Sequence, residues 1–156
     1  MLIQGEEPTP FIAFVRKFEM TYPIRILILR ADALTLGMFG LFGLTTDLLS
    51  YFAGRGAWKD MFFHNPLAVG VVEAHGLAII IAVLLIRQAA ANDQFVWHLT
   101  AMAAHLLLGI CNLVFWQVFI SANVVPLGIV ASAYHFVFVI TNSTAILLAR
   151  LKLADA

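Results

Sequence analysis

Histidine, aspartate, glutamate and asparagine recur inside apolar segments of this sequence, where their side chains could do chemistry. Three of the five histidines, His75, His105 and His135, each lie near the middle of a different apolar segment. An imidazole can hydrogen-bond, carry a proton or ligate a metal ion. Ionisable side chains at membrane depth are costly, by about 2.5–3.5 kcal/mol for Asp, Lys or Arg on insertion scales. Residues of this kind are therefore candidate functional residues.

A seven-residue spacing orders the polar residues in the second half of the chain. His98, His105 and Asn112 are seven apart, and the same interval separates His135 from Asn142. Residues at this spacing share one face of a helix. We therefore expect two polar stripes that face each other or the interior of a helix bundle.

Two acidic residues lie in the first half. Asp47 follows two glycines close to its face, which indicates that it faces the bundle, because small residues let helices approach closely. Glu73 has a glycine three residues away on either side, so we expect a packed face there, with the carboxyl protonated or paired. Glu73 and His75 are two residues apart, hence about 200° apart on a helix, and cannot both point at one small ligand.

These residues define a candidate polar seam with several possible roles. Its members are Asp47, Glu73, His75, His105, Asn112, His135 and Asn142. The seam could pack helices or a partner protein. It could hold one haem or a metal ion, with His75, His105 and His135 as candidate ligands. It could also carry protons in a small proton-coupled transporter, using Glu73 with His105 or His135. No catalytic residue is assigned, because the sequence has no phosphate-binding loop, H-E-x-x-H motif or nucleophile elbow.

The elements that must position these residues are membrane helices. Of the 156 residues, 62% are hydrophobic and only 12% are charged, against about 25% charged in soluble domains. A bilayer core of about 30 Å takes about 20 helical residues. Four segments are long enough, at about 30–53, 66–86, 95–118 and 126–148. Continuous apolar runs favour helices over barrel strands, so we predict a single all-α membrane domain, an integral four-helix bundle.

The distribution of Lys and Arg predicts the orientation. Seven of the nine lie on the side that holds both termini and the second loop, and the other side holds Arg55 and Lys59. The positive-inside rule then places both termini in the cytoplasm of a multi-pass cell-membrane protein. The lipid bilayer is the expected partner, beside a membrane protein or a second copy. Lys and Arg equal Asp and Glu in number, so no net charge favours nucleic acid.

Residues 9–22 form a separate pattern before the first span. Phe11, Phe14, Val15 and Phe18 recur at helical spacing, and Pro10 suits a first helical position. This pattern predicts an N-terminal amphipathic helix lying at the membrane interface.

The first two spans resemble those of DoxX-like membrane proteins. The resemblance rests on Leu29-Arg30 ahead of a glycine-rich first span, and on Pro66, Gly70, Glu73 and Gly76 in the second. It covers about residues 29–86, and Asp47 stands near the place where that family commonly has a lysine. The resemblance implies a four-helix bundle that acts as an accessory or subunit protein beside redox enzymes of the membrane, and it supplies no catalytic residue.

Overall fold

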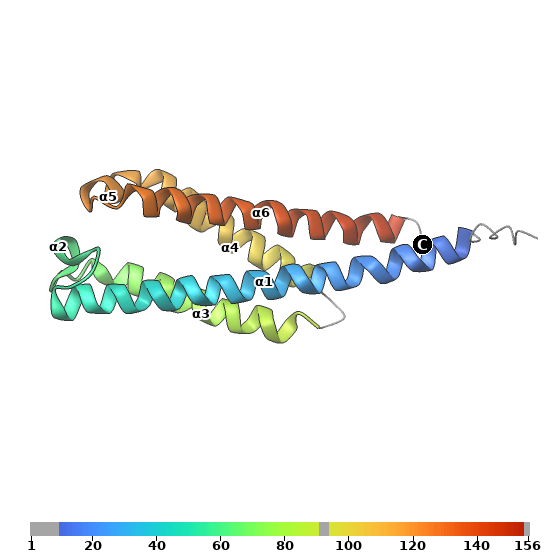
Figure 1. Ribbon diagram of the computed structural model, residues 1–156, viewed down its shortest axis with the longest axis horizontal. Coiled ribbons are helices and arrows are strands. Elements are labelled where there is room, and N and C mark those ends of the chain that lie inside the picture. The colour runs from blue at the N-terminus through green and yellow to red at the C-terminus, as the bar shows by residue number, and fades with distance from the viewer. Residues whose placement is uncertain (1–9, 91–93, 155–156) are drawn as a thin grey trace, which may run out of the picture.

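The computed structural model describes residues 10–90 and 94–154, with side chains over 23–90 and 94–150. Within these ranges the chain is helical, in the order α1 (Pro10–Ala53), α2 (Lys59–Phe62), α3 (Ala68–Gln88), α4 (Phe95–Val114), α5 (Trp116–Ser121) and α6 (Val125–Ala154). The long helices run side by side along the molecule, and the short helices α2 and α5 lie together at one end (Figure 1). The prediction of an all-α fold is confirmed.

The four long helices form two pairs. Helix α1 packs chiefly on α3 and α4 chiefly on α6, whereas contacts between the pairs are few and run mainly between α1 and α6. Figure 1 shows the same grouping, with α4 crossing behind towards α3 only at the end opposite α5. We call these the α1–α3 pair and the α4–α6 pair.

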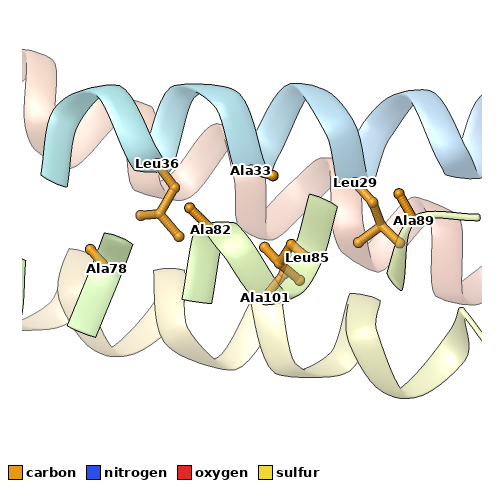
Figure 2. Packing of buried hydrophobic residues seen from close by; sticks show 8 residues of the cluster. All are labelled: Leu29, Ala33, Leu36, Ala78, Ala82, Leu85, Ala89 and Ala101. Carbon is orange, nitrogen blue, oxygen red and sulfur yellow. The ribbon is translucent and has the colours of Figure 1, made fainter. Parts of the chain in front are cut away.

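Small residues bring α1 and α3 into close contact. A buried apolar cluster joins one face of α1 to the alanine-rich face of α3 and extends to Ala101 of α4 (Figure 2); it consists of Leu29, Ala33, Leu36, Ala78, Ala82, Leu85, Ala89 and Ala101. A methyl group added at Gly40 would lie 3.1 Å from the backbone oxygen of His75. The two backbones therefore approach each other as small residues at membrane helix interfaces allow.

Four helices of the described chain are long and apolar enough to cross a bilayer. The spans are Pro23–Ala53, Ala68–Gln88, Phe95–Val114 and Val125–Arg150. Large apolar side chains such as Leu41, Phe52 and Leu107 lie exposed on their outer faces, which suits contact with lipid rather than water. The protein is therefore a small multi-pass membrane protein of all-α architecture.

Two predicted boundaries were wrong. The helix begins at Pro10 and continues unbroken to Ala53, with Pro23 inside it, so residues 10–22 are the first part of α1 and not a separate element. Pro23 lacks a backbone N–H but does not end this helix. The side chains of residues 10–22 lie outside the described part, so their placement at a membrane interface stays a prediction. The third span, expected to reach residue 118, ends at Val114, and the chain bends at Phe115 before α5.

Candidate functional site: a buried polar chain and an adjoining cavity

Asp32 of α1 is the centre of a buried polar chain. It is fully buried. Its Oδ1 accepts a hydrogen bond from His105 Nε2 of α4 at 2.8 Å, and its Oδ2 accepts one from Asn142 Nδ2 of α6 at 2.7 Å. Both carboxylate oxygens therefore have donors, as a buried carboxylate requires.

The chain continues from His105 to α6. His105 Nδ1 lies 2.9 Å from Nδ1 of His135, so one of these two nitrogens donates to the other. The ring of His105 also stacks on Phe138 and meets the ring of Tyr134 edge-on. Packing on both sides holds the imidazole in the orientation that joins Asp32 to His135.

Asn142 extends the polar chain towards the end of the molecule where α1 begins and α6 ends. Its Nδ2 donates both to Asp32 and to the backbone oxygen of Phe138, and its Oδ1 accepts from His98 Nδ1 at 2.8 Å. An amide oxygen only accepts, so His98 must carry its proton on Nδ1. The Nε2 atom of His98 is buried and has no hydrogen-bond partner within the part of the chain that the structure describes.

This polar chain joins the two helix pairs. Asp32 belongs to the α1–α3 pair, while His98, His105, His135 and Asn142 belong to the α4–α6 pair. A second link lies beside it, where the hydroxyl groups of Thr35 in α1 and Tyr134 in α6 are 3.3 Å apart. Because direct packing between the pairs is sparse, these hydrogen bonds are a large part of what holds the pairs together.

A separate acid–imidazole pair lies nearer the α2–α5 end. His75 Nδ1 of α3 donates to Asp47 Oδ2 of α1 at 2.6 Å. Asp47 is fully buried, and its Oδ1 has no hydrogen-bond partner among the described residues. The His75 ring lies against Gly43, where an added Cβ would overlap the ring. Glycine at this position therefore makes the room in which His75 reaches Asp47.

A cavity of about 460 Å³ lies between the helix pairs and adjoins both polar sites. Asp47 and His75 line it from one pair, and His135, Tyr134 and Asn112 line it from the other. Most of the remaining lining is apolar or aromatic, and the cavity reaches Trp58 and Phe119 at the α2–α5 end. The polar chain therefore ends on the wall of a largely apolar chamber.

The structure brings together most, but not all, of the residues singled out in the sequence. His105, His135 and Asn142 lie in the polar chain, and Asp47, His75 and Asn112 line the cavity. The two seven-residue stripes pair in antiparallel register, because His98 meets Asn142 and His105 meets His135. The stripes face each other, as the spacing predicts.

Glu73 does not lie where we expected. It is exposed on the outer face of α3, and a Cβ added at Gly70 or Gly76 would meet nothing within 4 Å. The expectation of a narrow packed face was wrong, because α3 turns its alanines and His75, not this glycine-flanked face, towards α1. Glu73 is not among the described residues that line the cavity.

Asp32 is the functional candidate that the sequence analysis missed. It lies two residues after Arg30, where the first span was expected to begin, and so near the expected edge of that span. The apolar span of α1 instead begins at Pro23, which places Asp32 well inside it. Its spacing from Leu29 and Leu36, both buried, is the signal that could have revealed it.

Within the described residues, His75, His105 and His135 do not come together as ligands of one metal ion. Across residues 23–90 and 94–150, no group of three or more His, Cys, Asp or Glu side chains could hold a metal ion. Both ring nitrogens of His105 already form hydrogen bonds. The Nε2 edge of His75 lies against Gly43. The chemistry that this arrangement does support is proton exchange between neighbouring acid and imidazole groups.

Comparisons with known proteins do not identify a family for this chain. The chain matches no family model, no curated protein and no solved structure.

Proposed function

We propose that the protein is a small proton-coupled transporter in which the two helix pairs move against each other about the buried polar chain. One observation carries this proposal: the hydrogen-bonded series Asp32–His105–His135 crosses from one pair to the other and ends at the cavity between them. A substrate in that cavity would touch both pairs. Moving the pairs would then change which end of the cavity is open.

A proton added to this chain changes how strongly it joins the pairs. With a neutral His105, the site contains an Asp32 carboxylate that is balanced only by hydrogen bonds. With a protonated His105, the same contact becomes an ion pair, whose charge-assisted hydrogen bond is stronger than a bond from a neutral donor. Protonation therefore strengthens the contact between α1 and α4, and deprotonation weakens it. The same groups can in this way bind a proton and set the position of the helix pairs.

The experiment follows the distance between the pairs as the pH changes. Spin labels are attached at Lys59→Cys on α2 and Ser121→Cys on α5, both exposed, in a background without the single native cysteine, Cys111→Ala. In bilayers, the distance distribution should shift when the pH is lowered from about 8 to about 5, because imidazole groups take up protons as the pH falls. Asp32→Asn should abolish the shift, and Glu73→Gln should leave it intact. A distribution that does not change with pH in the parent protein would contradict the proposal.

A second candidate function is that of a DoxX-like accessory or subunit protein, favoured by the exposed carboxyl of Glu73 on α3. An ionisable side chain on the outer face of a membrane helix is costly in lipid and is stabilised by a partner. Under this proposal Glu73→Gln weakens association with the partner or a second copy, while Asp32→Asn leaves it unchanged. Size measurement of the complex in native membrane discs, before and after the substitution, tests it.

We also propose that the chain resides in the cell membrane with both termini in the cytoplasm, on the charge distribution alone. The polar chain would then lie in the cytoplasmic half of the bilayer, and the cavity would lie in the outer half.

A further inference from the structure

The wall of the cavity is mostly apolar and includes a few polar side chains. Rings such as Phe42, Trp58 and Phe115 and aliphatic side chains make up most of the wall. Its volume of about 460 Å³ lies within the range of small-molecule pockets, about 300–1,000 Å³. A wall of this kind binds an apolar or aromatic body, and only a few polar atoms remain to fix its orientation.

One polar atom of a cavity-lining residue has no partner among the residues that the structure describes. Asp47 is fully buried and lines the cavity. Its Oδ2 accepts the hydrogen bond from His75, but its Oδ1 accepts none from the described part of the chain. Buried polar atoms are almost always hydrogen-bonded, and an exception calls for an explanation. A carboxylate oxygen can only accept a hydrogen bond, so the missing partner is a donor.

The charge of the Asp47–His75 pair favours one kind of donor on a ligand. With His75 neutral and donating its Nδ1–H, the Asp47–His75 pair carries one negative charge inside the apolar chamber. Among the cavity-lining residues of the described chain there is no Lys or Arg that could balance it. A positively charged donor on a ligand would neutralise the pair and form a charge-assisted hydrogen bond, which is the stronger kind. Aromatic rings in the wall add attraction for a cation that lies over their faces.

We propose that the cavity binds amphiphilic amines: molecules with an apolar, ring-sized body and one protonated amino group that donates to Asp47 Oδ1. This names the substrate class of the proposed transporter. The idea that these amines are transported rests on the proposed function. The idea that they bind does not, because binding requires only Asp47 and the cavity. His75 holds the carboxylate in place through the hydrogen bond to its Oδ2.

The test compares a charged probe with a neutral probe of the same shape. Binding of (1-naphthyl)methylamine, which is protonated at neutral pH, and of 1-naphthalenemethanol is measured by equilibrium dialysis against the full chain in lipid nanodiscs. Empty nanodiscs give the partitioning into lipid, which is subtracted. The amine should bind more tightly than the alcohol by about tenfold or more, as expected for a hydrogen bond to a charged group.

Three variants locate the binding. Asp47→Asn is nearly isosteric and should remove that preference for the amine while alcohol binding stays unchanged. Glu73→Gln makes the same chemical change on the exposed face of α3 and should leave amine binding within about twofold, as for surface substitutions. Ala131→Phe fills part of the cavity from α6, which does not carry Asp47, and should weaken binding of both probes.

The outcomes separate this inference from the proposed function. Equal affinity for the amine and the alcohol, or an unchanged amine preference in folded Asp47→Asn, would overturn the inference. If Asp47→Asn does not fold, undiminished binding to Ala131→Phe overturns it instead. Asp32→Asn should still bind the amine, because Asp32 lies outside the cavity lining. Retained binding in a protein whose helix pairs do not respond to pH would contradict the transport mechanism and leave the binding site standing.

Discussion

The Nδ1 atoms of His105 and His135 lie 2.9 Å apart, so two imidazoles from different helices share one proton position. Only one of the two nitrogens can carry a proton in this contact. On its other side His105 is hydrogen-bonded to Asp32. A proton that enters from the cavity at His135 can therefore be passed to His105 and stabilised there by the carboxylate. This relationship connects a cavity between the helix pairs to the contact that joins them.

Substitution of Asp32 should be the most damaging change in the polar chain. Asp32→Ala removes the acceptor for both His105 and Asn142, so the buried His105 Nε2 loses its partner and Asn142 Nδ2 keeps only the backbone oxygen of Phe138. We expect a loss of about 1–3 kcal/mol in the free energy of unfolding, as for a buried hydrogen-bonding group left unsatisfied. Asp32→Asn should cost less, because the amide oxygen still accepts one hydrogen bond.

Thermal unfolding in detergent would measure both changes. Asp60→Asn, on the exposed short helix α2, is the matched control and should be close to the parent protein. Equal stability of Asp32→Ala and the control would mean that the buried polar chain around Asp32 does not hold the helix pairs together.

Two glycine substitutions should have opposite outcomes. Gly43→Ala places a methyl group where the His75 ring lies, so the ring must move and its hydrogen bond to Asp47 must lengthen or break. We expect destabilisation by about 1–3 kcal/mol, as in overpacked sites. At Gly70 an added Cβ meets nothing within 4 Å. Gly70→Ala should therefore be neutral or stabilising, by up to about 1 kcal/mol from helix propensity. The unfolding temperatures of the two variants test this contrast, and a reversed order would place His75 elsewhere.

Glu73→Gln should leave the fold unchanged. Because Glu73 is exposed, Glu73→Gln removes no buried contact and should not lower the free energy of unfolding. Circular dichroism and thermal unfolding of the variant would check this. Loss of folding would show that Glu73 takes part in an ion pair that requires its negative charge.

The charge distribution predicts the accessibility of the loops. A cysteine placed at Arg55 in the Cys111→Ala background should react with a membrane-impermeant reagent added to intact cells. A cysteine placed at Asp93 should react only after the membrane is opened. The reverse pattern would invert the proposed orientation and move the cavity to the cytoplasmic half of the bilayer.

Hydropathy and periodicity predict the architecture because both are properties of single continuous segments of the sequence. Four apolar spans and the facing polar stripes of α4 and α6 follow from segment length and a seven-residue spacing. The placement of Glu73 could not be derived in this way. Flanking glycines allow close packing but do not require it, and here a neighbouring helix packs at Gly43 but not at Gly70.

Asp32 was missed for a related reason. An acidic residue near an arginine at the expected start of a span has the pattern of an interfacial residue. Its role depends on which residues of α4 and α6 lie opposite, and that is set by the packing of the two helix pairs. The cavity likewise arises from the sparse contact between the pairs, which no pattern within a single helix records.

The measurement that tests the account most directly is nitrogen NMR of the histidine-labelled protein in bilayers. A proton shared between His105 and His135 should produce a through-hydrogen-bond coupling between their Nδ1 atoms, and lowering the pH should leave His105 protonated on both nitrogens. Asp32→Asn should weaken this second protonation, whereas Glu73→Gln should not affect it. Absence of the coupling, or independent titration of the two rings with no effect of Asp32, would contradict a proton-carrying chain between the helix pairs.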